Sequence, residues 1–232
     1  MKKQIILLIG IFICFNLKSQ SLLPKKYGVK IGGNMSNLIA NSEEGVKNPS
    51  ASLGYGFAGG FYMQIPINNT LSVNPEILYS QKSSTFEYDY VYDYDINQRD
   101  YYKSKSSITL SFIEVNPTLS YLAAYNLSLN IGPSIHYMIS SSHEYEQTLT
   151  ERLDETTSAE VLGDGVFDES SLDIGLNAGL SYFINEDFIL NGTVYSGFMK
   201  IGEVLRPIDI LNNEPTTNIK LSNIRLSLSY LF

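Results

Sequence analysis

Eight segments of this chain alternate apolar and polar residues, and the connections between them are long and short in turn. The short connections are Pro66–Asn69, Ala123–Asn126 and Asn185–Asp187. The long ones lie at about 39–51, 87–104, 141–170 and 202–218. A membrane-crossing antiparallel barrel has tight turns on one side, long loops on the other, and both termini on the tight-turn side. The rhythm therefore predicts an all-β fold: an eight-stranded antiparallel up-and-down transmembrane β-barrel with long extracellular loops, short periplasmic turns and periplasmic termini.

The eight expected strands share one pattern, in which apolar side chains on one face alternate with small or polar side chains on the other. They cover about 27–38, 52–65, 70–86, 104–122, 127–140, 171–184, 188–201 and 219–232. The alternation slips near Phe112 and Ile113, which predicts a β-bulge in the fourth strand.

A soluble β-sandwich or a lipocalin-like barrel also has alternating strands, and three features favour the membrane barrel. The strands are long for a sandwich, at about 12–15 residues. The second face carries Gly, Ser, Asn and Thr with scattered charges, which is typical of a polar barrel interior. Aromatic residues gather at the short-turn ends, as in a girdle at the membrane interface. They are Tyr27, Phe61, Tyr121, Tyr125, Tyr182, Phe188, Tyr230 and Phe232.

The N-terminus has the pattern of a secretory signal peptide. Lys2 and Lys3 precede an apolar run at 5–15, which is too short to span a bilayer as a helix. We therefore expect a signal peptide at 1–20 and one barrel domain at 21–232. Cys14, the only cysteine, lies in the leader, so the mature chain is expected to have no disulfide. A formal net charge of −8 disfavours nucleic-acid binding, because phosphate contacts need clustered basic residues.

Four segments carry a family resemblance: 27–38 (YGVKIGGNMSNL), 113–119 (IEVNPTL), 131–135 (IGPSI) and 174–180 (IGLNAGL). Together they resemble the PorT-like outer-membrane β-barrel family of Bacteroidota, whose members carry the outer membrane protein beta-barrel domain. The ending Tyr230-Leu231-Phe232 is similar to the aromatic signal read by the barrel assembly machinery. The resemblance implies an integral outer-membrane protein in the lipid bilayer. Because one family member serves a protein secretion system, it also suggests an accessory role in secretion.

Charged residues of both signs fall on the predicted inner face. They include Lys30 and Arg225 on the first and last strands, which meet where the barrel closes, and Glu76 and Glu114 on the neighbouring third and fourth strands. Unpaired, such charges would be costly in a narrow interior. We therefore predict a salt-bridge network of Lys30, Glu76, Glu114 and Arg225 that packs the lumen. A proton- or ion-conducting path is the alternative.

The sequence gives little support to catalysis. The chain has two histidines, His136 and His143, and a hydrolase or acyltransferase site would have to be assembled from His143, Ser141 and Asp173. No Gly-x-Ser-x-Gly elbow is present. We expect no enzyme, no catalytic or metal-binding residue and no cofactor. The predicted function is a non-enzymatic outer-membrane protein of interaction or envelope-structural type. The alternatives are a narrow pore for small solutes and an outer-membrane barrel enzyme.

The least generic segment is the second long connection, where tyrosines alternate with acids. We expect this hairpin to continue beyond the membrane and to bind a protein partner, because tyrosine offers large contact area at low entropic cost. Its candidate binding residues are Tyr88, Tyr90, Tyr92, Tyr94, Asp89, Asp93 and Asp95. These acids do not follow an EF-hand pattern. The alternative is a solvated hairpin tip. The acid-rich connection 141–170 is expected to form a flexible cap with a short helix near Leu149 and Leu153.

Overall fold

The computed structural model describes residues 24–42, 50–95, 98–151, 155–159, 172–203 and 217–232. The predicted signal peptide at 1–20 lies outside these ranges and stays a prediction. Within them, no helix has the length and apolarity needed to cross a bilayer.

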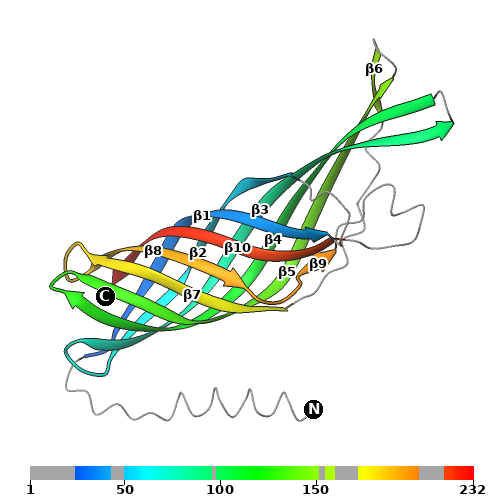
Figure 1. Ribbon diagram of the computed structural model, residues 1–232. Coiled ribbons are helices and arrows are strands. Elements are labelled where there is room, and N and C mark those ends of the chain that lie inside the picture. Colours follow the sequence, from blue (N-terminus) through cyan, green and yellow to red (C-terminus); the bar gives the residue numbers. More distant parts are fainter. Residues whose placement is uncertain (1–23, 43–49, 96–97, 152–154, 160–171, 204–216) are drawn as a thin grey trace.

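Ten antiparallel strands form one sheet, and eight of them close into a barrel (Figure 1). The barrel strands follow one another around the wall, and β10 pairs back with β1 from Gly28–Leu231 to Ser42–Thr217. Two short strands are additions, with β6 on β5 and β9 on β10. The predicted eight-stranded up-and-down barrel is confirmed. The strands are β1 Lys26–Ser42, β2 Ser50–Pro66, β3 Leu71–Asp95, β4 Gln98–Ala124, β5 Leu127–Glu151, β6 Glu155–Ala159, β7 Leu172–Phe183, β8 Phe188–Gly197, β9 Gly202–Glu203 and β10 Thr217–Leu231.

The three predicted short turns are confirmed, and two of them use the same device. The Oδ1 atom of Asn68 accepts hydrogen bonds from the backbone N–H groups of Thr70 (2.9 Å) and Leu71 (2.8 Å). Asn185 Oδ1 accepts in the same way from Asp187 (2.9 Å) and Phe188 (2.8 Å). An asparagine that bonds the backbone two residues further on fixes a tight turn, which sets the register of both hairpins.

Three strands run past their predicted ends at 86, 104 and 140, and for β3 and β4 this confirms the expectation that their hairpin continues. β3 and β4 continue through most of the expected loop at 87–104, and β5 continues to Glu151. Figure 1 shows these three strands projecting past the rest of the barrel at one end. The helix expected near Leu149 is wrong, because Leu149 lies in β5 between Tyr102 of β4 and Thr157 of β6. The seventh predicted strand is also too long, because β8 ends at Gly197.

The outer face of the barrel carries an apolar belt. On β3 the outward residues are apolar from Leu71 to Tyr79, and on β4 from Ile113 to Tyr121. This length matches the roughly 9–11 residues of a transmembrane strand. The aromatic residues predicted to form a girdle are all exposed at the short-turn side of the belt. Beyond the belt, on the long-loop side, the outward residues of β3 and β4 become polar, such as Ser83 and Thr109.

The inner face reverses this pattern. Inside the belt it is polar, as expected, with buried Ser, Asn and charged side chains. Beyond the belt it becomes apolar, so the expectation of a polar face throughout is wrong there. The residues of this apolar core are Leu38, Phe86, Ile108, Leu110, Phe112, Met138, Tyr195, Ile201, Ile219 and Leu221. Where the barrel wall extends beyond the bilayer, its outer face contacts water. Apolar side chains in that part can therefore be buried only on the inner face. A smaller cluster of Tyr62, Ile189, Leu231 and Phe183 lies at the short-turn end.

The bulge predicted near Phe112 exists, but its extra residue lies in the neighbouring strand. Phe112 pairs with Met138, and Ser111 pairs with Ser140, so Ile139 of β5 is unpaired. The even-numbered residues of β4 point inward on both sides of this position. The apparent slip in the hydrophobic pattern of β4 therefore marks the change from a polar to an apolar interior.

Candidate functional site

Buried ion pairs join strands that are not neighbours in the barrel wall. Lys30 of β1 donates a hydrogen bond to Glu76 of β3, and Arg225 Nη1 of β10 donates to Glu114 Oε2 of β4 at 2.8 Å. Arg225 Nη2 also lies 3.9 Å from Glu76 Oε1. Arg225 therefore sits between the two carboxylates, and the structure brings all four predicted lumen residues into one network.

Lys82 of β3 is a central member that the sequence analysis missed. Its Nζ lies 2.7 Å from Glu114 Oε1, and both side chains have at most 1% of their surface exposed. Ser80 Oγ donates to the same carboxylate oxygen at 2.5 Å. The signal was present in the sequence, because Lys82 has the same period-two phase as Glu76.

A chain of polar side chains runs from Glu76 to Glu114 by way of Lys82. Ser134 Oγ donates to Asn116 Oδ1, and Asn116 Nδ2 donates to Glu76 Oε1 at 2.9 Å. Ser134 Oγ therefore accepts from His136 Nε2, which lies 2.7 Å away. With the proton on Nε2, His136 Nδ1 accepts from Lys82 Nζ at 3.2 Å. This tautomer gives every member of the chain a partner.

Aromatic rings cover the network where it meets the apolar core. Lys82 Nζ lies 5.0 Å from the ring centroid of Phe112 and 5.2 Å from that of Tyr195, distances at which cation–π attraction operates. The Tyr195 ring lies 4.0 Å from the His136 ring, and its hydroxyl donates to Asp173 Oδ2 at 2.7 Å. The rings exclude water from the charges on the long-loop side.

Formal charge in this interior balances. The positive side chains are Lys30, Lys82 and Arg225, and the negative ones are Glu76, Glu114 and Asp173. All six are buried, and they come from five different barrel strands. Charges that are already paired and buried are suited to cross-linking the wall rather than to receiving a reactant.

The residues considered for a catalytic site have other partners. His143 Nε2 is hydrogen-bonded to Ser106 Oγ of β4. Asp173 accepts from the Tyr195 hydroxyl at 2.7 Å and from the Met199 backbone N–H at 3.2 Å. Within the described ranges, no cluster of His, Cys, Asp or Glu is arranged to hold a metal ion.

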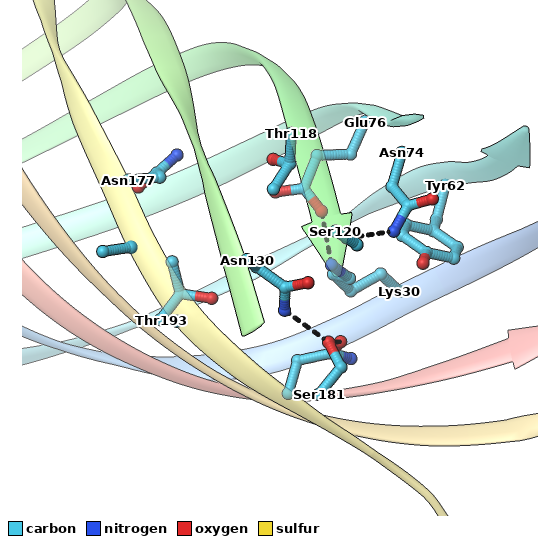
Figure 2. A pocket seen from close by; sticks show the side chains of 13 residues that line it. Lys30, Tyr62, Asn74, Glu76, Thr118, Ser120, Asn130, Asn177, Ser181 and Thr193 are labelled. Atoms are coloured by element: carbon cyan, nitrogen blue, oxygen red, sulfur yellow. Dashed lines mark hydrogen bonds and ion pairs between the residues drawn. The ribbon is translucent and has the colours of Figure 1, made fainter. Parts of the chain in front are cut away.

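A small polar cavity lies on the short-turn side of the ion pairs. Figure 2 shows Lys30 and Glu76 joined at its wall, with the Asn74–Ser120 and Asn130–Ser181 hydrogen bonds nearby. All but two of the lining residues, Ala178 and Gly179, carry an amide, hydroxyl or charged group. A wider depression at the short-turn end of the barrel shares Ser120 with this cavity.

The predicted binding hairpin lies in the extension of the wall. The backbone of β3 pairs with β4 as far as Asp95 and Gln98. Pairing of β2 with β3 ends at Ser50 and Glu87. Among the described residues, the stretch 88–95 of β3 therefore has a strand on one side only. The strands β3, β4, β5 and β6 form a four-stranded extension of which this stretch is one edge.

Comparisons with known proteins agree with this architecture. A family model described as "Outer membrane protein beta-barrel domain" matches residues 19–203. No curated protein matches the sequence significantly.

Among solved structures, the chain is similar to Ail, the attachment invasion locus protein of Yersinia pestis, crystallised with a heparin analogue (11% identity, 90% of this chain and 100% of that one, TM-score 0.40). Neisserial surface protein A gives the same values. OprG from Pseudomonas aeruginosa gives 11% identity over 89% and 95% of the two chains, with a TM-score of 0.39. Likenesses this distant carry no inference about function.

Proposed function

The chain belongs to the outer membrane protein beta-barrel domain family and is an integral protein of the outer membrane, and from this premise we propose that it is a non-enzymatic interaction protein. Its surroundings are the lipid bilayer, and its working surface is the extension of β3 and β4 beyond the apolar belt. The finer assignment to the PorT-like barrels of Bacteroidota, with an accessory role in protein secretion, is part of this proposal.

The observation that carries the proposal is the contrast between the filled lumen and the extended wall. Glu114, Lys82 and Phe112 have at most 1% of their surface exposed, and Arg225 reaches Glu114 across the interior from β10. The apolar core follows on the long-loop side. The described interior thus favours neither a conducting path nor a reactant pocket, whereas the extension offers a long surface outside the lipid.

The free edge of β3 suggests how a partner binds. An edge strand presents unpaired backbone N–H and C=O groups, and an extended segment of another protein can add to it as a further strand. The edge is acidic, with Asp89, Asp93 and Asp95 along it. In the backbone register, Lys103 and Arg99 of β4 lie opposite Asp89 and Asp93. A partner segment with basic residues fits this edge best.

The same proposal includes the orientation of the barrel in the outer membrane and the C-terminal signal for its assembly. The C-terminus lies at the short-turn end, where the Phe232 backbone N–H donates to the carbonyl of Tyr27 at 2.8 Å. The exposed Phe232 side chain is free for recognition, which supports a role for Tyr230-Leu231-Phe232 as the signal for the barrel assembly machinery. We therefore place the short turns and both termini in the periplasm, and the extension outside the cell.

The test replaces residues 88–101 with a short Gly/Ser turn and compares proteins that co-purify from intact outer membranes. Binding through the extension predicts loss of the partner with unchanged membrane insertion. Changing Tyr88, Tyr90, Tyr92 and Tyr94 to Ser is expected to weaken recovery more than changing Asp89, Asp93 and Asp95 to Asn, because buried aromatic residues carry most interface energy. A stronger loss from the Asp set would point to a partner held mainly by charge. Unchanged recovery in both sets would refute the proposal.

Two controls separate the competing functions. Conductance of the purified protein in planar bilayers would support the narrow pore, which the packed lumen disfavours. An enzyme would lose activity on His143→Ala and keep it on exchange of the hairpin. Recovery of a secretion component as the partner, dependent on residues 88–101, would support the accessory role in secretion.

A further inference from the structure

We propose that the barrel contains a water-binding site in the short-turn half of its lumen, supplied with water from that end alone. The site is the polar cavity lined by Lys30, Glu76, Asn74, Asn130 and Asn177 (Figure 2). It is independent of the proposed protein interaction, because it lies inside the wall and on the opposite side of the ion pairs from the extension.

Unpartnered amide atoms are the first reason. Asn74 Oδ1, Asn130 Oδ1, and both Oδ1 and Nδ2 of Asn177 are buried without a hydrogen-bond partner. In Figure 2 the amide of Asn177 has no dashed line, although Asn74 and Asn130 each donate to a serine. Buried polar atoms without partners are costly, so several that line one cavity indicate a polar ligand. Three acceptors and one donor are complementary to water.

The size of the cavity is the second reason. The space in which the centre of a water molecule can lie is about 20 Å³. A single bound water needs roughly 10–15 Å³ of such space. The cavity therefore holds one or two waters. Since each buried water makes about three hydrogen bonds, this number is enough for the four unpartnered atoms.

The route for water follows from the neighbouring surfaces. Ser120 lines both the cavity and the depression at the short-turn end, whose wall also includes Ser72 and Ser128. In the other direction, the Glu114–Lys82 pair and then the apolar core fill the lumen. The smaller apolar cluster at the short-turn end comes from β2, β7, β8 and β10, whereas these three serines lie on β3, β4 and β5. The site is thus the inner end of a blind path along the β3–β5 side.

The test measures hydrogen–deuterium exchange of side-chain amides by NMR, with the full barrel in lipid nanodiscs. The matched control is Asn34, which is equally buried and whose Oδ1 is likewise without a partner. It lies outside the cavity on the long-loop side, where its Nδ2 donates to the carbonyls of Phe57 (3.1 Å) and Gln81 (3.2 Å). We expect the Asn177 amide to exchange at least about tenfold faster than that of Asn34, because exchange in a dry region requires local opening. Ser120→Phe is expected to slow exchange at Asn177 and leave Asn34 unchanged.

Each other outcome would overturn part of the proposal. Equally slow exchange at both residues would mean a dry cavity, and equally fast exchange would mean a lumen hydrated along its whole length. If neither Ser120→Phe nor a second block, Ser128→Phe, slows Asn177, water enters by another route. Asn177→Leu gives an independent readout. In a dry cavity this change removes unpaired polar atoms and raises the folding equilibrium constant, whereas in a hydrated cavity it lowers that constant by depriving the water of partners.

Discussion

Removing the Glu114 carboxylate is expected to destabilise the barrel strongly, and the identity of the rescuing substitution tests the pairing. Glu114 contacts Lys82 at 2.7 Å and Arg225 at 2.8 Å. In the Glu114→Gln variant, Arg225 still has the Glu76 carboxylate as an ion-pair partner at 3.9 Å. Lys82, which is fully buried, loses its ion-pair partner. Breaking a buried pair in this way costs about 3–5 kcal/mol. At about 1.4 kcal/mol per tenfold change, the folding equilibrium constant should fall by a factor of about 10²–10⁴.

The rescue comes from removing the orphaned cation. Glu114→Gln with Lys82→Met restores a formal sum of zero and places an apolar side chain beside Phe112 and Tyr195. Replacing a buried ion pair by apolar groups is often neutral or stabilising, so most of the loss should be recovered. The matched control is Glu114→Gln with Lys30→Met. It has the same formal charge, but it leaves Lys82 unpaired and takes from Glu76 its closest cation, so it should recover nothing.

Folding of these variants is followed in lipid vesicles across a urea series. The chain has no tryptophan, so gel migration of unheated samples, together with circular dichroism, reports the folded fraction. Wild-type unfolding of Glu114→Gln would show that the charges are hydrated and independent. Equal rescue by Lys82→Met and Lys30→Met would show that net charge matters and specific pairing does not. Either result would refute the reasoning.

Three further predictions concern topology, the apolar core and assembly. Protease added to intact cells should cut within 141–170 and leave a protected barrel, whereas cleavage at 123–126 with 141–170 spared would invert the orientation. Phe112→Ala should destabilise the folded barrel by about 3–5 kcal/mol in the same urea assay, because it opens a cavity in a filled core; an unchanged midpoint would mean that this core is loosely packed. Deleting Phe232 should reduce the amount of folded barrel in cells but leave refolding of purified protein in lipid unchanged, and equal losses in both would assign Phe232 a role in stability.

The sequence by itself determined the barrel, because both of its signals are local. Alternation with a period of two assigns each side chain to the lipid or to the interior, and Asn68 and Asn185 set tight turns through their own backbone. The apolar residues of β3 and β4 also have the length of a membrane span. The lumen charges Lys30, Glu76, Glu114 and Arg225 could be found from their phase within the strands.

The tertiary structure decided what those faces contact. Lys82 pairs with Glu114 on the adjacent strand, and Lys30 with Glu76 beyond β2, because the register of the strands brings these positions together; only Arg225 reaches Glu114 across the lumen. The change to an apolar interior beyond the belt depends on where the wall leaves the lipid, so the sequence pattern of β4 looked like a slip in phase. The length of β5 was also underestimated, since the polar residues at 141–151 become strand when β4 and β6 complete their backbone hydrogen bonds.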